Sequence, residues 1–275
     1  MVTVLHAPGT WIDPTSGNPL RYQDLLAGLA SKQAVLLGEN HDRADIHRWQ
    51  LHVIAGLLAI RRDVVVGFEM FPRRVQPALD EWIFGDLTEN EFLEKVEWTS
   101  VWGFPAELYL PIFQFCRQFK VPMKALNCRR SLVTEVGKLG WDAVAVEDRD
   151  GLTPARAASE AHRHYLFAIT GGARPDRRAT SALDPEFDRF VRAQQTWDRA
   201  FACNIAESHH VATAPLVVGI IGSGHLDYGY GTPYQLADLD LHDVAVLLTS
   251  DEGQFDLGTK VGISDAVFRL EKQDR

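Results

Sequence analysis

Three consecutive segments in the first quarter of the chain alternate between the pattern of a buried strand and that of an amphipathic helix. Residues 34–37 form a short apolar run that Gly38 ends, which is typical of a strand buried on both faces of a parallel sheet. Residues 44–60 carry apolar side chains at helical spacing, and residues 63–68 are again apolar and mostly β-branched. The pattern predicts a strand, a helix and a second strand, which is the unit of a right-handed parallel crossover.

The rest of the chain continues this alternation of strand and helix patterns. Pro122 weakens one of the predicted strands because proline cannot donate a hydrogen bond to a neighbouring strand. The further elements that we predict are helices at 75–84, 89–96, 107–119 and 184–208, and strands at 121–126, 215–221 and 244–248.

Residues 141–184 differ in character from the segments around them. Acidic residues, glycines and prolines interrupt a predicted helix at 155–169, and we interpret the segment as a helical lid or flap. We therefore predict one domain over residues 1–275, with this lid inserted at about 141–184. Its fold class is α/β, with a mostly parallel central sheet that helices cover on both faces.

The charge balance limits the partners that we expect. The 275 residues include 28 Lys and Arg against 37 Asp and Glu, and the net charge of −9 argues against a general binder of nucleic acid or of an anionic membrane. No window approaches the roughly 20 consecutive apolar residues of a membrane span. Residues 1–20 lack a basic segment followed by an apolar stretch. We expect a cytoplasmic protein as the sequence stands, and a periplasmic or lipid-anchored one if a leader was removed.

Polar residues follow four of the predicted strands. The segments read GENHD at 38–42, GFE at 67–69, NCRR at 127–130 and GSGH at 222–225. Because ligands of open α/β sheets bind beyond the carboxyl ends of the strands, we expect these residues to form one site. Either histidine alone would more often be an ordinary hydrogen-bonding residue, but two G-x-x-H segments after buried strands favour a functional site.

The residue types in these segments suit a transition metal. Imidazole and carboxylate groups bind zinc, iron or manganese, so Glu39, His41 and His225 are the candidate metal ligands. A metal-bound imidazole needs a polar partner that fixes its tautomer, and Asp42 or Asn127 could supply one.

Other polar residues are candidates for acid–base chemistry and for support of the site. Glu69 lies between bulky apolar residues, where burial should raise its pKa, and it is a candidate general base or ligand. Arg130 could compensate that charge or stabilise negative charge that develops during a reaction. Gln50 and Gln194 fall on the predicted core faces of two helices and, with Asp198, could support the site from below. The alternative is a boundary position wetted by solvent.

Aromatic residues gather near glycines and prolines at 98–109 and 228–234. They could form a mouth that holds a planar cofactor, or they could simply pack at loop corners. The segment HRHY at 162–165 could approach a haem edge or cap a metal, or be a solvated helix face. A tyrosine phenolate ligates ferric haem iron in some haem proteins. The candidate haem ligands are Tyr109, Tyr165, Tyr228, Tyr230 and Tyr234.

Several of these motifs, in this order, resemble those of the ChaN-like proteins. The resemblance runs from about residue 10 to about residue 250. Two features depart from the family. After the GENHD segment at 38–42, Ile46 and His47 stand where the family has a histidine pair, and a lipoprotein signal is absent. The matching motifs are LLGENHD at 36–42, GFEMF at 67–71 with Gln76, WG at 102–103 with Tyr109 and Pro111, ALN at 125–127 with RR at 129–130, Gln194 with WD at 197–198, and GSGH at 222–225 with GYG at 229–231 and Pro233.

The resemblance implies a role in haem or iron handling. ChaN-like proteins include iron-regulated, haem-binding lipoproteins and belong to a superfamily with the Tiki and TraB proteins and erythromycin-esterase-like enzymes. That superfamily shares two G-x-x-H motifs, a glutamate and an arginine, which correspond here to His41, His225, Glu69 and either Arg130 or Arg129. The resemblance also implies a homodimer with haem held by a tyrosine at the subunit interface, but no motif assigns that tyrosine.

Three hypotheses follow from the sequence. The first is a ChaN-like haem- or iron-binding protein with a polar pocket at the strand ends. The second is a metal-dependent hydrolase or peptidase, in which Glu39, His41 and His225 hold a divalent ion, Glu69 acts as base and Arg130 stabilises negative charge. The third is a pocket that binds a small ligand without chemistry. Whether the protein is an enzyme stays open at this point.

Overall fold

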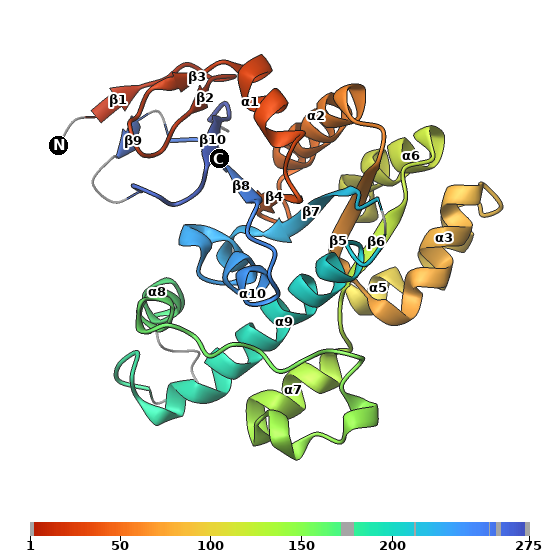
Figure 1. Ribbon diagram of the computed structural model, residues 1–275, viewed down its shortest axis with the longest axis vertical. Helices are drawn as coiled ribbons and strands as arrows, with labels where there is room; N and C mark the ends of the chain where they lie inside the picture. The colour runs from red at the N-terminus through yellow and green to blue at the C-terminus, as the bar shows by residue number, and fades with distance from the viewer. Residues whose placement is uncertain (1–2, 172–178, 212, 253, 257–259, 273–275) are drawn as a thin grey trace.

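A computed structural model describes residues 3–171, 179–211, 213–252, 254–256 and 260–272 of the chain. Strands from both ends of the sequence contribute to its central sheet (Figure 1). Two further strands, β1 (Thr3–Leu5) and β9 (Gln254–Asp256), form a separate antiparallel pair. The strands of the central sheet are β2 (Trp11–Ile12), β3 (Pro19–Leu20), β4 (Ala34–Glu39), β5 (Val64–Pro72), β6 (Met123–Asn127), β7 (Leu216–Gly222), β8 (Val244–Ser250) and β10 (Ala266–Arg269).

Within the described residues the sheet has eight strands in the order β3-β2-β10-β8-β4-β7-β5-β6. The pairings from β10 through to β6 are all parallel, whereas β2 pairs antiparallel with β10 and with β3. The predicted fold class, a mostly parallel α/β sheet, is confirmed. None of the described helices is both long and apolar enough to cross a membrane.

Helices pack on both faces of the sheet (Figure 1). Side chains of α1, α2, α3 and α6 join one core cluster with one face of the inner strands, and side chains of α9 and α10 join another with the opposite face. The helices are α1 (Tyr22–Leu29), α2 (Ala44–Ile60), α3 (Gln76–Phe84), α4 (Glu89–Lys95), α5 (Trp98–Val101), α6 (Leu110–Phe119), α7 (Arg130–Leu139), α8 (Glu160–Thr170), α9 (Asp188–Glu207) and α10 (Thr232–Asp238).

The apolar run of β4 follows from this two-sided burial. Val35 and Leu37 contribute to the core on the α2 face, and Leu36 contributes to the core that contains Phe201 of α9. Successive strand residues point to opposite faces, so a strand with helices on both sides must be apolar at every position. The polar residues of this region therefore begin only at Glu39, where the strand ends.

Two strands differ from their predicted bounds in ways that matter for the site. β5 extends to Pro72, so Glu69 lies inside the strand rather than after it, and the pairing of β5 with β6 shifts register between Phe68 and Pro72. β6 begins at Met123, one residue after Pro122. Pro122 has no N–H for a ladder, but its carbonyl oxygen accepts a hydrogen bond from the Val66 N–H at 3.0 Å.

The segment predicted as a lid packs against α9 and α10 along part of its length. The predicted helix start at residue 155 is wrong: residues 152–159 have no regular secondary structure, and α8 begins at Glu160. The backbone of Arg156 is used elsewhere, because its N–H donates to Gln235 and its carbonyl oxygen accepts from Gln195. Residues 172–178 of this segment lie outside the described residues, and movement of the segment as a lid stays a prediction.

Candidate functional site

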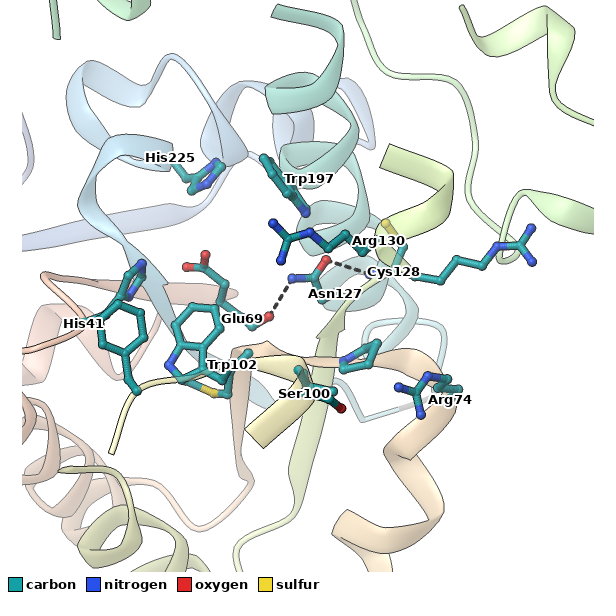
Figure 2. Close-up of a pocket in the computed structure, with 15 residues that line it drawn as sticks. His41, Glu69, Arg74, Ser100, Trp102, Asn127, Cys128, Arg130, Trp197 and His225 are labelled. Carbon is teal, nitrogen blue, oxygen red and sulfur yellow. Dashed lines mark hydrogen bonds between the residues drawn. The ribbon is translucent and has the colours of Figure 1, made fainter. Parts of the chain in front are cut away.

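The carboxyl ends of β4, β5 and β7 meet at one edge of the sheet, beside β6. Glu39 at the end of β4 is in register with Gly222 at the end of β7, and a cavity of about 660 Å³ opens beyond them. This volume falls within the roughly 300–1,000 Å³ of small-molecule sites. His41, Glu69 and His225 line the cavity together (Figure 2).

His41 is held by a buried carboxylate. Its Nδ1 lies 2.7 Å from Oε1 of Glu39, whose side chain is fully buried. Burial alone lowers the pKa of His41, but the hydrogen bond to Glu39 and the charge of Glu69 outweigh burial, so the pKa is raised. Because a carboxylate only accepts, Nδ1 carries the proton and donates, which leaves Nε2 for the cavity.

Glu39 also accepts hydrogen bonds from other protein groups. The Tyr109 hydroxyl donates to Oε1 at 2.8 Å, and Nε2 of Gln50 donates to Oε2 at 3.2 Å. His47 lies alongside, with Nδ1 3.0 Å from Oε1 of Gln50 and 3.4 Å from Oε2 of Glu39. Glu39 therefore lies behind His41 and orients it. His47 was not predicted as a site residue, although it lies three residues before Gln50 on the buried face of α2.

His225 forms a second pair of the same kind on the opposite side of the site. Its Nδ1 lies 2.9 Å from Oδ1 of Asp198, a side chain that is 1% exposed on α9. Burial lowers the pKa of His225, but Asp198 outweighs this effect and raises it to about 9. A side chain at Gly231 would not fit here, because its Cβ would lie 2.6 Å from Oδ1 of Asp198 and 2.4 Å from the His225 carbonyl oxygen.

Glu69 lies between the two histidines. Its Oε2 accepts a hydrogen bond from the Gly222 N–H at 2.5 Å, and burial raises its pKa against the opposing charges of His225 and His41. A Cβ on Gly222 would lie 3.3 Å from that oxygen and 3.1 Å from Cε1 of His41, so glycine leaves room for both groups. A carboxyl of raised pKa between two imidazoles is an arrangement suited to proton transfer.

The two neighbouring arginines after β6 both line the cavity but differ in their partners. Arg129 pairs with Asp148 at 2.9 Å, and its backbone N–H donates to Asp150. Arg130, the first residue of α7, is exposed and is directed into the cavity near Asn127 (Figure 2). Of the two arginines that the superfamily motif allowed, Arg130 is thus the one beside the acid–base groups.

The predicted set of three metal ligands is not assembled in the described residues. No group of three or more His, Cys, Asp or Glu side chains there is arranged to hold one metal ion. Both oxygens of Glu39 accept hydrogen bonds from protein groups, Oε1 from His41 and Tyr109 and Oε2 from Gln50, and Glu39 does not line the cavity with His41 and His225.

The supporting residues predicted from sequence occupy different places. Gln50 lies behind Glu39, and Asn127 binds the Glu69 carbonyl oxygen at 2.8 Å rather than a histidine. Asp42 is exposed, and no described hydrogen bond joins it to a histidine. Gln194 does not line the cavity but lies in a neighbouring depression that shares Arg130 and Trp197 with it, because the buried face of α9 presents Gln195 and Asp198 instead.

The five candidate tyrosines have contrasting surroundings. Tyr109 is fully buried, and burial with the charge of Glu39 raises its pKa, so it has no surface for haem. Arg156 covers the ring of Tyr234 at 4.4 Å. Tyr165, Tyr228 and Tyr230 form a cluster, the tyrosine cluster, with ring centroids 5.5–5.9 Å apart.

One hydroxyl of the tyrosine cluster is paired with a carboxylate. Tyr165, which is half-buried on α8, donates a hydrogen bond to Oδ2 of Asp227. Burial raises the pKa of Asp227 to about 6, and burial with the Asp227 charge raises the pKa of Tyr165. His162, buried on α8, stacks on Tyr230 at 5.9 Å. Asp227 was not among the predicted site residues, since no local pattern in the sequence marks it as a partner of α8.

Comparisons with known proteins agree with the fold and the motifs. The family model described as "Haem-binding uptake, Tiki superfamily, ChaN" matches residues 25–236. No curated protein matches the chain. The structure of cofacial haem binding to ChaN of Campylobacter jejuni is 20% identical, with a TM-score of 0.71 over 94% of this chain and 95% of that one.

Two other solved structures share the fold at lower similarity. The type III effector HopBA1 is 12% identical, with a TM-score of 0.52 over 90% of this chain and 92% of its own. An erythromycin esterase, EreC, is 11% identical, with a TM-score of 0.51 over 87% of this chain and 76% of its own. At these identities the likeness concerns the fold alone.

Proposed function

Because the chain belongs to the haem-binding uptake family ChaN of the Tiki superfamily, we propose that it binds ferric haem, with Tyr165 as the residue that holds the iron. The observation that carries the choice of residue is the hydrogen bond from the Tyr165 hydroxyl to Asp227. A tyrosine ligates ferric haem as the phenolate, so a ligand of this type needs a group that takes its proton. Asp227 accepts the hydrogen bond of this hydroxyl, and its charge keeps the phenol protonated until a ferric ion replaces the proton.

The surface beside Tyr165 supports the same proposal. Ile169 lies one turn further along α8, on the same side of the helix, and is 51% exposed. Val261 is 49% exposed, two residues from Ile263, whose carbonyl oxygen accepts from the Tyr228 N–H. Exposed apolar side chains around an aromatic cluster suit the apolar face of a porphyrin. Bound haem would supply an iron centre that the protein can carry.

A hemin titration followed by absorbance tests this proposal. The wild-type protein should give a saturable Soret shift, and Tyr165→Phe should abolish it because the phenyl ring has no oxygen to offer. Tyr234→Phe is the matched control and should keep the wild-type shift, since Arg156 covers that ring. A Soret shift that persists in Tyr165→Phe would mean that another residue is the iron ligand. The absence of a shift in the wild type would overturn the proposal of haem binding.

A second candidate function, hydrolysis, is favoured by the two histidine–carboxylate pairs on either side of Glu69. We infer that Glu69 takes a proton from the attacking water. His225, whose pKa is raised to about 9, is protonated at neutral pH and gives its proton to the leaving group. Burial raises the pKa of Glu69 and makes it a stronger base, while Asp198 raises the pKa of His225 and keeps it an acid at neutral pH.

Hydrolysis of 4-nitrophenyl acetate tests the second function. Glu69→Gln should remove turnover, and His225→Asn should lower it less because 4-nitrophenolate leaves without a proton, while His242→Asn, a change at an exposed histidine, should keep it. Turnover that persists after dialysis against EDTA supports catalysis by protein groups. Turnover that EDTA removes and Zn²⁺ restores would favour the metal-dependent form, and equal rates in all variants would overturn the assignment.

A further inference from the structure

The arginines that line the cavity differ in whether a carboxylate pairs with them. Arg74 makes a two-point contact with Glu97, with N–O distances of 2.5 and 2.9 Å, and Arg129 pairs with Asp148 at 2.9 Å. For Arg130 the described residues include no carboxylate within ion-pair distance and no acceptor for its guanidinium. Arg130 is therefore the cavity cation whose charge the described part of the chain leaves uncompensated.

The side chain of Arg130 places this charge inside the cavity. The side chain leaves the start of α7 and reaches into the cavity between Trp197 and Asn127, on the side away from His41 (Figure 2). Asn127 does not compete for it, because its amide nitrogen donates to the Glu69 carbonyl oxygen and its amide oxygen accepts from the Cys128 N–H. The guanidinium thus presents its donors to whatever enters the cavity.

Aromatic rings form the walls between Arg130 and the first histidine. Trp102 and Phe104 lie against His41 with ring centroids 4.6 and 5.2 Å away, and Trp197 lies on the side of Arg130. A ligand that fills the space would contact apolar walls along its body and a fixed positive charge at one end. The planar guanidinium binds a carboxylate through two parallel hydrogen bonds.

We propose that the cavity takes a small carboxylic acid derivative, an ester or amide whose free carboxylate binds Arg130 while its reactive carbonyl lies toward Glu69 and the two histidines. This inference rests on the second proposed function for the reaction, though not for the binding. In the balanced step, water adds to the acyl carbon and gives a proton to Glu69. The bond to the leaving group then breaks, His225 gives that group its proton, and the products are an acid and an alcohol from an ester, or an acid and an amine from an amide.

The proposal gives Arg130 a different role from charge stabilisation in the transition state. An arginine that stabilises the developing oxyanion lowers kcat for every substrate when it is removed. An arginine that anchors the substrate carboxylate raises KM for carboxylate-bearing substrates and leaves neutral ones unchanged. A matched pair of substrates, one charged and one neutral, therefore separates the two roles.

Binding is measured first, without any reaction. Benzoate and benzamide are titrated into the wild-type protein, Arg130→Ala, Arg130→Lys and Arg74→Ala by calorimetry. The wild type should bind benzoate in preference to benzamide, and Arg130→Ala should weaken benzoate binding by about tenfold to a hundredfold, as loss of a charged hydrogen-bonded contact does. Arg130→Lys should recover part of the affinity, and Arg74→Ala should change it little because Glu97 occupies Arg74.

Turnover is measured second, with mono(4-nitrophenyl) glutarate and the neutral 4-nitrophenyl hexanoate. Arg130→Ala should raise KM for the charged ester with little change in kcat, and leave the neutral ester unaffected. If benzoate binds through Arg130 but neither ester is hydrolysed, hydrolysis fails and the anion site stands. If benzoate and benzamide bind alike, or an equal loss of kcat appears with both esters, the carboxylate anchor is overturned. Arg130 is exposed, and an unchanged unfolding midpoint verifies that its variants are folded.

Discussion

At the scale of single residues, the site depends on charges that water does not reach. The carboxylates of Glu39 and Asp198 are each held against a histidine, and their side chains are 0% and 1% exposed. A buried carboxylate needs a partner of opposite charge or several hydrogen bonds. Removing either histidine would leave its carboxylate without that partner. Each pair therefore stabilises the folded protein and also supplies groups to the site.

The pair of His225 and Asp198 should make stability depend on pH. The pKa of His225 is raised from 6.5 to about 9 in the folded protein. The stabilisation is therefore fully present below about pH 6.5 and is lost as the pH rises to about 9, by about 3 kcal/mol in total. Urea unfolding between pH 6 and 9 should show this fall in the wild type, and much less of it in His225→Asn.

The matched control for this titration is an exposed histidine. His242 has a side chain that is 70% exposed, and His242→Asn should keep the fall in unfolding free energy of the wild type. If His225→Asn and the wild type lose stability in parallel over this range, another group is responsible. Titration of the His225 ring by NMR would give its pKa directly.

The residues of the site could be predicted from sequence where they follow buried strands, because parallel strands bring their carboxyl ends together. Glu39 and His41 are two residues apart after a buried strand, and the strand-end rule was enough to single them out. Tyr109 was expected near haem, yet it reaches 70 residues back to Glu39. Tertiary contacts of that separation leave no local pattern, and the same holds for Asp227 and Tyr165.

At the scale of elements, the buried strands were predictable because burial on both faces imposes an unbroken apolar run. β4 and β8 each contain their predicted strand and extend it by two residues, and β7 lies one residue further along the chain than predicted. The start of α8 was not predictable in this way, since the apolar and polar spacing of residues 155–159 fits a helix equally well. The backbone of Arg156 binds Gln235 of α10 and Gln195 of α9 instead, and no local pattern in the sequence indicates these contacts.

The edge of the sheet gives an element-scale prediction. β6 is an edge strand of the sheet, and Gln76 at the start of α3 binds two backbone groups on its open side. Nε2 of Gln76 donates to the Met123 carbonyl oxygen and Oε1 accepts from the Ala125 N–H, both at 2.8 Å. Gln76→Ala leaves these backbone groups without that partner. We expect a loss of about 1–3 kcal/mol in the free energy of unfolding and faster hydrogen exchange at the Ala125 amide.

A second glutamine provides the control for Gln76. Gln114 makes an exposed contact with Glu89, and Gln114→Ala should change the free energy of unfolding by less than about 0.5 kcal/mol. Equal losses in the two variants would mean that Gln76 does not complete the strand. The position of β6 matters for the site, because Asn127 at its end holds the backbone of Glu69.

At the scale of the whole molecule, haem binding and assembly should be linked. A porphyrin held by Tyr165 at the surface would bury one apolar face against the tyrosine cluster and leave the other in water. A second copy of the chain, bound in the same way, would cover that face. The net charge of −9 on each copy opposes the contact, so two chains without haem should stay apart at low salt.

We therefore predict a dimer that depends on haem and is favoured by salt. Light scattering after gel filtration should give the monomer mass without hemin and twice that mass with it, and the dimer fraction should rise from low to moderate ionic strength as the repulsion is screened. Tyr165→Phe should remain monomeric with hemin, whereas Tyr234→Phe should dimerise like the wild type. If the dimer forms equally without hemin, the prediction is wrong and the interface lies elsewhere. Dimerisation would then not depend on the apolar face of bound haem.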